Sequence, residues 1–278
     1  MPTALLFDIK RYAINDGPGI RITLFFKGCP LSCVWCHNPE GISPAPQRLF
    51  TRGKCIGCNT CVEQGPEACP TRAREMSGRP YSVDELMREI VRETIVMDRS
   101  GGGVTFCGGE PLMQPVVLLE LLRRCGLEGI HRAVDTTLYA SPATVDALVP
   151  HTDLFLVDLK HMDSALHRTY CGVPNDLILD NIRRVAASGR AVEMRIPLVA
   201  GVNADDGNLR ATARFLASLA RPDITVKLLP YHDVAGSKHE KLGTVYNPHG
   251  YPLSKPSPDS LARIPELFAR EGITAVVG

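Results

Sequence analysis

The chain has 278 residues, 44% of them hydrophobic, and a formal net charge of +1, a composition that is ordinary for a globular protein. This charge balance provides no basic field for nucleic acid or a membrane surface, so we expect neither partner. No stretch is long and apolar enough to span a membrane, and Asp8 arrives before a secretory apolar core forms. We therefore expect a cytoplasmic protein that acts as a monomer.

The first informative segment combines a strand-like run, residues 21–27, with three cysteines. Cys29, Cys33 and Cys36 follow it, separated by three residues and then by two. Three thiolates can ligate three irons of a [4Fe–4S] cluster and leave the fourth iron open to a ligand that is not protein. An open coordination position is suited to chemistry rather than to bracing a fold. The alternative is a zinc site completed by a second cysteine pair from later in the chain.

Residues 44–80 form the next segment, crowded with prolines, glycines and four cysteines. So short a stretch cannot bury enough apolar surface to fold unaided, and we interpret it as an insertion that folds around metal. Three of its cysteines are spaced as in ferredoxins, and the fourth precedes a proline. We expect one auxiliary [4Fe–4S] cluster ligated by Cys55, Cys58, Cys61 and Cys69. Cys107 competes as the fourth ligand, and a zinc ribbon is the alternative metal site.

From residue 80 onward, short apolar runs alternate with helical patterns. Ser82 and Glu85 form a capping box at the start of one helix, and Ser141 with Pro142 marks the start of another. The apolar runs are dense, as in parallel strands covered on both faces. They lie at residues 103–107, 130–135, 153–159, 191–196, 224–229 and 273–277. Repeated strand–helix units predict an α/β fold with a parallel sheet, open or curled into a barrel.

Polar residues gather where the predicted strands end, which is where ligands of α/β folds bind. Gly108 and Gly109 allow backbone to approach a ligand closely, and the Glu110 carboxylate can accept hydrogen bonds from an ammonium group. Each such residue alone is compatible with a turn or a surface position. Polar groups at successive strand ends nevertheless favour a shared site. Besides Glu110, the polar residues at the ends of the predicted strands are Asp135, Thr136, Thr137, Asp158, Lys160, Arg195 and His232.

Together these motifs resemble those of radical S-adenosylmethionine (SAM) enzymes, whose hallmark is this three-cysteine spacing with an aromatic residue, here Trp35, before the last cysteine. Within that superfamily the chain resembles glycyl-radical enzyme activating enzymes, of which pyruvate formate-lyase activating enzyme is the best-known type. The resemblance covers nearly the whole chain outside the insertion. It is carried by residues 16–21, 36–40, 101–105, 158–160 and 228–232.

The resemblance implies a partial (β/α)6 barrel formed by residues 1–43 and 81–278, with residues 44–80 as a ferredoxin-like insertion. It implies that the first cluster binds SAM and cleaves it reductively to a 5′-deoxyadenosyl radical. That radical would abstract hydrogen from a backbone glycine of a partner glycyl-radical enzyme. The electron donor would be flavodoxin or ferredoxin, and the auxiliary cluster would relay electrons or shape the docking surface.

The resemblance also assigns residues to roles. Cys29, Cys33 and Cys36 would be catalytic, and the turn containing Asp16 would meet the partner's peptide loop, although a simple tight turn is the alternative. The residues implied to bind the cofactor are Trp35, Cys36, His37, Gly108, Gly109, Glu110, Asp135, Thr136, Thr137, Leu138, Tyr139, Lys160, Arg195 and His232. Residues 137–139 depart from the pyruvate formate-lyase type, and Cys107 replaces a small hydroxyl residue.

Two other functions stay open at this point. One is a radical SAM enzyme that acts on a small molecule or peptide without a glycyl-radical product, which residues 16–21 disfavour. The other is a ferredoxin-type electron carrier, which the expected cofactor pocket disfavours. The partner also stays open among pyruvate formate-lyase, diol dehydratase, choline lyase, sulfonate lyase and aryl decarboxylase, and the insertion argues against the first of these.

Overall fold

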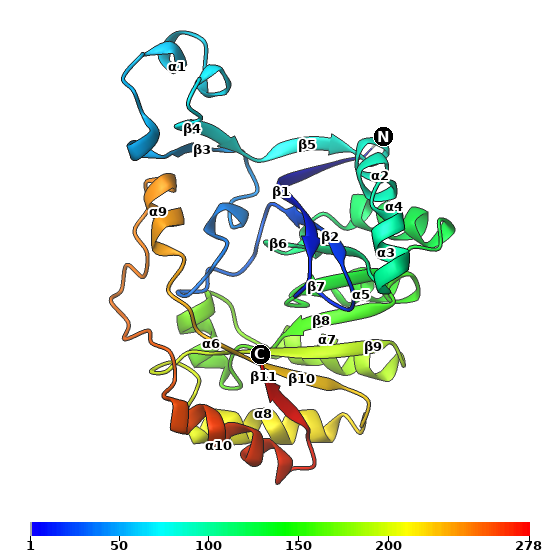
Figure 1. The fold of residues 1–278 in the computed structure, drawn as a ribbon. Helices are drawn as coiled ribbons and strands as arrows, with labels where there is room; N and C mark the ends of the chain where they lie inside the picture. Colours follow the sequence, from blue (N-terminus) through cyan, green and yellow to red (C-terminus); the bar gives the residue numbers. More distant parts are fainter. Residues whose placement is uncertain (1) are drawn as a thin grey trace.

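A nine-stranded mixed sheet forms the centre of the computed structural model, which describes residues 2–278 (Figure 1). Its strand order is β11-β10-β9-β8-β7-β6-β2-β1-β5. Neighbouring strands from β2 to β11 are parallel. These strands are β2 (Arg21–Phe26), β6 (Gly103–Gly108), β7 (Arg132–Thr136), β8 (Leu154–Asp158), β9 (Ala191–Leu198), β10 (Thr225–Pro230) and β11 (Ala275–Val277).

The predicted parallel sheet is confirmed, because every apolar run singled out in the sequence forms one of its strands. Two further strands were not predicted: β1 (Thr3–Ala13) pairs antiparallel with β2, and β5 (Arg79–Ser82) pairs antiparallel with β1. The outer half of β1 is mostly exposed and carries charged residues. Its sequence therefore lacks the dense apolar run that identified the central strands.

Helices follow the parallel strands and cover the outer face of the sheet (Figure 1). The capping box at Ser82 is present and starts α2 (Val83–Val91), and Ser141 caps α5 (Pro142–Leu148), as predicted. The other helices of this layer are α3 (Thr94–Ser100), α4 (Pro115–Leu127), α7 (Asp176–Ala187), α8 (Asp206–Ser218) and α10 (Pro258–Ala269). Helix α6 (Ser164–Cys171) lies outside the layer, and its last residues accept hydrogen bonds from the amides of Ser32 and Val34. The apolar faces of the helices in this layer and the outward side chains of the strands, such as Leu24 and Phe106, form the core. The other face of the sheet is left for polar side chains.

Residues 47–77 project from this body as a separate lobe (Figure 1). The last two residues of the predicted insertion, 79 and 80, belong instead to β5 of the main sheet. β3 (Gln47–Phe50) and β4 (Arg74–Ser77) form a two-stranded antiparallel sheet, and the loop between them contains the one-turn helix α1 (Thr60–Glu63). No residue from 51 to 72 is buried. The segment touches the rest of the chain mainly through α9 (Gly236–Leu242), which packs against β3.

None of the helices formed by residues 2–278 combines the length and the apolar character that crossing a bilayer requires.

Candidate active site

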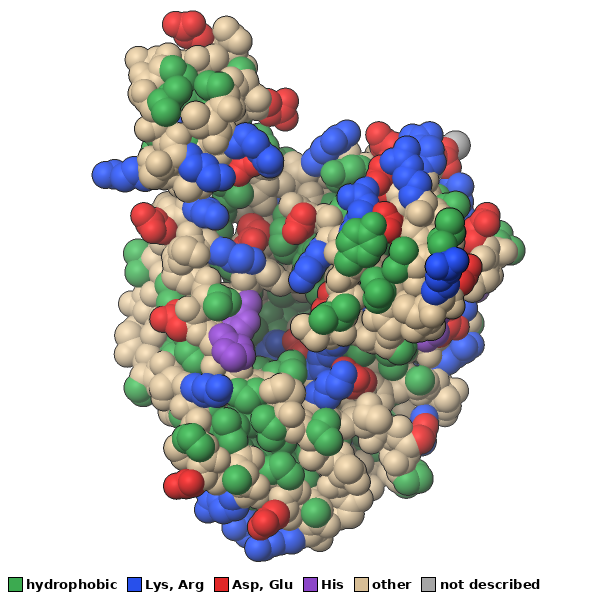
Figure 2. All heavy atoms as spheres, in the orientation of Figure 1, with side chains coloured by type: hydrophobic (Ala, Val, Ile, Leu, Met, Phe, Trp, Pro, Cys, Tyr) green, Lys and Arg blue, Asp and Glu red, His purple; other side chains and the backbone are tan. Residues whose placement is uncertain are grey.

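A cavity of about 620 Å³ opens at the carboxyl ends of the parallel strands, and all three N-terminal motif thiols line it. Figure 2 shows the hollow near the centre of one face, beside a group of histidine side chains. Its volume lies in the range of small-molecule sites. The structure therefore brings together one set of predicted site residues: Cys29, Cys33, Trp35, Cys36, His37, Gly108, Gly109, Thr137, Lys160 and His232.

The cysteine loop is held in place by the backbone of its neighbours. The amide of Cys29 donates to the Ile42 carbonyl at 3.0 Å, and the amide of Glu110 donates to the Gly28 carbonyl at 2.7 Å. A Cβ at Gly109 would lie 2.4 Å from that same Gly28 oxygen. Only glycine permits this approach, so the Gly-Gly-Glu turn braces the cysteine loop.

Burial sets the charge state of these thiols. It raises the pKa of Cys29 far above its ordinary value and the pKa of Cys36 to about 12, so without a cation both would stay protonated at neutral pH. Cys33 differs, because the neighbouring Cys171 side chain lowers its pKa. Buried thiols that ionise only with a positive partner suit an iron–sulfur cluster. Within residues 2–278, no three cysteine, histidine or acidic side chains converge on a single metal ion.

Glu110 takes a different place from the one expected. The residue is fully buried, and its carboxylate accepts hydrogen bonds from the Thr137 amide at 2.8 Å, the Thr137 hydroxyl at 2.6 Å and the Thr136 hydroxyl at 2.7 Å. Burial raises the pKa of Glu110, and these hydrogen bonds offset part of that rise. The carboxylate thus positions Thr137, which lines the cavity, and does not itself face it.

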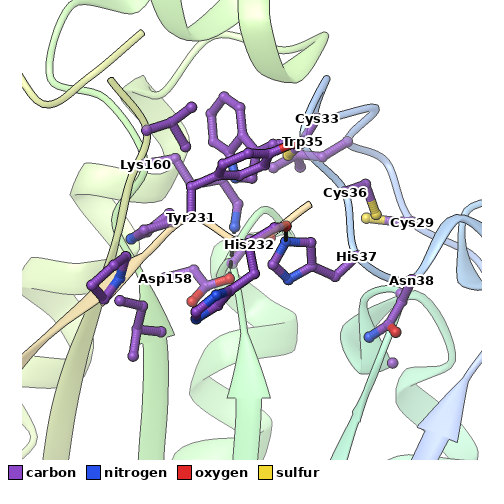
Figure 3. Close-up of a pocket in the computed structure, with 18 of the residues that line it drawn as sticks. Cys29, Cys33, Trp35, Cys36, His37, Asn38, Asp158, Lys160, Tyr231 and His232 are labelled. Atoms are coloured by element: carbon purple, nitrogen blue, oxygen red, sulfur yellow. Dashed lines mark hydrogen bonds and ion pairs between the residues drawn. The ribbon is translucent and has the colours of Figure 1, made fainter. Parts of the chain in front are cut away.

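Two pairs of lining residues form direct contacts (Figure 3). The Lys160 ammonium donates to the Asp158 carboxylate at 2.6 Å. Burial alone would lower the pKa of Lys160, but Asp158 and the nearby thiols raise it above its usual range. In the second pair, the His37 Nε2 atom lies 2.9 Å from the His232 carbonyl oxygen. This contact joins the cysteine loop to the chain after β10, and burial lowers the pKa of His37.

Charged side chains alternate along the inner face of the sheet next to the cavity. Arg195 donates to Asp135 at 3.0 Å and to Glu193 at 3.2 Å, and Lys227 pairs with Glu193 at 2.8 Å. Burial raises the pKa of Asp135 to about 6, although Arg195 opposes that shift. Arg195 also donates to the Asn15 carbonyl at 2.8 Å. Arg195 thus ties the β1–β2 turn to the inner face of the sheet.

The turn around Asp16 is ordered by its own contacts. Thr23 donates to the Asp16 carboxylate at 2.8 Å, and Thr105 donates to the Asp16 carbonyl at 2.7 Å. The buried guanidinium of Arg21 donates to the Pro18 carbonyl at 3.0 Å. Desolvation by burial lowers the pKa of Arg21 to about 10. Asp16 itself does not line the cavity, whereas the neighbouring Asn15 does.

Several predicted residues lie outside the cavity lining: Asp16, Glu110, Asp135, Thr136, Leu138, Tyr139 and Arg195. Leu138 is fully buried in the apolar core, with a left-handed φ of 58°. Sequence reasoning also missed lining residues, among them Asn15, Leu31, Asn38, Pro197, Val199, Lys227, Leu229 and Tyr231. Alternation along β9 and β10 is the signal that marks Pro197, Lys227 and Leu229 as inward-facing positions.

The four insertion cysteines do not lie in this cavity. Cys55 and Cys58 are exposed, and Cys61 and Cys69 are half-buried. Hydrogen bonds led by the Arg74 amide lower the pKa of Cys69 to about 7. Cys107 lies instead on β6, where its thiol donates to Asp135 at 3.2 Å.

Comparisons with known proteins agree with this geometry. The family model of the radical SAM superfamily matches residues 23–213. The trans-4-hydroxy-L-proline dehydratase activating enzyme of Clostridioides difficile is 36% identical to this chain over 99% of both chains. The pyruvate formate-lyase 2-activating enzyme of Escherichia coli K12 is also 36% identical, over 99% of this chain and 92% of its own length.

Among solved structures, a domain of a pyruvate-formate lyase-activating enzyme from Bacteroides vulgatus is 46% identical with a TM-score of 0.55. The match covers 64% of this chain and 99% of that domain. The superfamily model matches most of the chain, and the two activating enzymes are more than 30% identical to it over nearly its full length. The chain belongs to the radical SAM superfamily and, within it, to the glycyl-radical enzyme activating enzymes.

Proposed function

We propose that this enzyme activates a partner glycyl-radical enzyme, with Cys29, Cys33 and Cys36 as ligands of a [4Fe–4S] cluster. This proposal rests on the observation that the three thiols line one cavity at the carboxyl ends of the parallel strands. When bound, the cluster and SAM supply a 5′-deoxyadenosyl radical that removes hydrogen from a glycine of the partner. The small-molecule and electron-carrier alternatives lack such support, because the full-length relatives are activating enzymes.

The residues of the chain bind and orient the cofactor and exclude water. Trp35 is buried beside the cysteines, and His37, His232, Asp158 and Lys160 line the same cavity (Figure 3). Gly108 and Gly109 present backbone to the cavity, and Thr137 presents a hydroxyl that Glu110 fixes. Asp135, Thr136, Leu138, Tyr139 and Arg195 would act from behind this lining. Such preorganised groups hold a ligand without reorganising when it reacts.

The fold would form a partial barrel whose open side admits the partner enzyme. Six parallel strands, β2 and β6 to β10, followed by helices, support a partial (β/α)6 barrel. Its open side would admit a peptide loop past the turn that contains Asn15 and Asp16. The Asp16 carboxylate is half-buried and holds the turn through Thr23. Asp16 would therefore shape the docking turn.

The insertion would hold the auxiliary [4Fe–4S] cluster through Cys55, Cys58, Cys61 and Cys69. Cys69 is favoured over Cys107, because hydrogen bonds stabilise its thiolate while Cys107 is engaged with Asp135 in the main sheet. An exposed cluster in a projecting lobe would suit electron delivery from flavodoxin or ferredoxin. The enzyme would act as a monomer in the cytoplasm.

The test is activation of a partner under anaerobic conditions. Reconstituted enzyme is reduced and incubated with SAM and each candidate glycyl-radical enzyme in turn. We expect 5′-deoxyadenosine in all reactions, and a glycyl-radical EPR doublet with only one class of partner. Formation of 5′-deoxyadenosine with no radical on any glycyl-radical enzyme would contradict the proposal.

An Asp16→Ala variant separates docking from cofactor chemistry. It should still cleave SAM but generate little glycyl radical, because the docking turn is released from Thr23. Unchanged radical yield would remove Asp16 from the account, and the matched Asp8→Ala change on the exposed part of β1 serves as the control.

A further inference from the structure

The segments that follow β8 and β9 leave the sheet beside the cavity. The two strands pair regularly up to Asp158 and Arg195, and the Leu159 amide still donates to the Arg195 carbonyl at 2.9 Å. Regular pairing ends there, because Pro197 has no N–H group with which to continue it. The carbonyls of Lys160 and Pro197, one from each segment, receive their hydrogen bonds from outside the sheet.

The donor to both carbonyls is the side chain of Asn203, which is only 1% exposed. Its Nδ2 atom donates to the Lys160 carbonyl at 2.7 Å and to the Pro197 carbonyl at 2.6 Å, and its Oδ1 atom accepts from the Val199 amide at 2.8 Å. A carboxamide carries two donor hydrogens on one nitrogen and an acceptor on its oxygen. A carboxyl or hydroxyl group has at most one hydrogen to donate and could not make all three bonds.

Asn203 is itself held in place by the first turn of α8. The Asn208 Nδ2 atom donates to the Asn203 carbonyl at 2.8 Å, and the Asn208 Oδ1 atom accepts from the Met162 amide at 2.9 Å. The segment after β8 is therefore bonded both to Asn203 and to the residue that anchors Asn203. Buried and fully bonded amides of this kind give a rigid arrangement.

The residues that Asn203 holds line the cavity. Lys160, Pro197 and Val199 are all lining residues, whereas Asn203 is not. Lys160 also carries the ammonium group that donates to Asp158. A single buried side chain behind the cavity thus sets the position of the wall with Lys160 relative to the wall with residues 197–199.

We propose that Asn203 is a positioning residue that holds these two walls in the arrangement that binds SAM. The inference rests on the proposed function in one respect, namely that this cavity takes SAM. Binding groups must be held within about 0.5 Å of the productive geometry, so a small displacement of either wall lowers affinity. Asn203 acts through Lys160 and residues 197–199 and does not itself face the ligand.

The experiment changes the donor hydrogens of the amide. Asn203→Asp keeps the oxygen that accepts from Val199 but can donate at most one hydrogen, and Asn203→Ala removes all three bonds. Asn175→Asp is the matched control, because Asn175 is also 1% exposed and donates to two backbone carbonyls, those of His161 and Met162, at 2.8 Å each. Neither of these two residues lines the cavity. SAM affinity is measured by equilibrium dialysis on reconstituted enzyme, and amide exchange is measured on metal-free protein.

We expect both Asn203 variants to bind SAM roughly 10- to 100-fold more weakly, as is typical when a residue that supports binding groups is lost. The rate of 5′-deoxyadenosine formation at saturating SAM should fall less than the KM for SAM rises. Asn175→Asp should stay within about twofold of the parent affinity. In metal-free protein the Val199 amide should exchange faster in Asn203→Ala than in Asn203→Asp, which keeps its acceptor.

Parent-like SAM affinity in the Asn203 variants would overturn the assignment, and if Asn203→Asp fails to fold, Asn203→Ala alone decides. An equal loss of affinity in Asn175→Asp would also overturn it, because general loosening of the segment would then be the cause. Unchanged exchange of the Val199 amide in Asn203→Ala would show that the amide does not hold this wall. A reconstituted parent that does not bind SAM would refute the proposed function itself, so the two failures are distinguishable.

Discussion

The two groups of cysteines lie in regions of opposite character. The loop with Cys29, Cys33 and Cys36 is bonded through its backbone to the neighbouring sheet and to α6, independently of any metal. The loop with Cys55 to Cys69 has no buried residue between positions 51 and 72. The first region is shaped by the core of the protein, whereas the second has too little apolar surface to shape itself. One cluster would thus enter a prepared site, and the other would create its own.

The largest expected difference between the two regions is in amide hydrogen exchange with and without iron. In metal-free protein, residues 51–72 should exchange nearly as an unfolded chain, and reconstitution should slow them about a thousandfold. Residues 28–36 should change far less, because the amides of Gly28, Ser32 and Val34 are already bonded within the chain. Equal protection of residues 51–72 in both forms would contradict the comparison.

Removing one carboxylate from each region should change the free energy of unfolding by different amounts. Glu110→Ala should destabilise the protein by about 2–4 kcal/mol, because it strands the buried hydroxyls of Thr136 and Thr137. Glu75→Ala in the insertion removes an exposed pair with Arg72 and should cost about 0–1 kcal/mol. Urea denaturation measures both, and similar losses in the two variants would show that the insertion is packed as tightly as the site.

A smaller effect is expected on the pH dependence of folding stability, through Asp135 on the inner face of the sheet. Folded Asp135 has a pKa of about 6, against about 4 in an unfolded chain. The folded state therefore binds the extra proton, so the contribution of Asp135 to stability is greatest below about pH 4 and is lost as pH rises through about 6, a change of up to about 3 kcal/mol. Asp135→Asn should flatten this part of the stability–pH curve. An unchanged slope in that variant would contradict the assignment.

The sequence alone predicted much of the sheet, because the central strands carry dense apolar runs that report burial on both faces. The capping box at Ser82 and the N-cap at Ser141 were equally readable, since a cap is a local arrangement of a few residues. The strands β1 and β5 were not, because they pair at an edge and are partly exposed. Pairing partners far apart in sequence leave little local signal.

The site was predicted by residue type more successfully than by orientation. The cysteine loop, His37 and His232 face the cavity as expected, since each follows directly from a motif. Glu110 and Leu138 do not, because the side chain that faces a ligand depends on the path of the turn after the strand. The hydrogen bonds that join the cysteine loop to the end of α6 were invisible in the sequence, because 139 positions separate Ser32 from Cys171 and only the fold brings them together.

The most direct test of the central claim compares Cys33→Ala with Cys58→Ala, each reconstituted anaerobically and reduced with dithionite. The account predicts that Cys58→Ala loses iron from the insertion but still produces 5′-deoxyadenosine from SAM at close to the parent rate. Cys33→Ala should produce essentially none. Persistent 5′-deoxyadenosine formation in Cys33→Ala, or its abolition in a Cys58→Ala protein that retains the SAM-responsive EPR signal, would contradict the account.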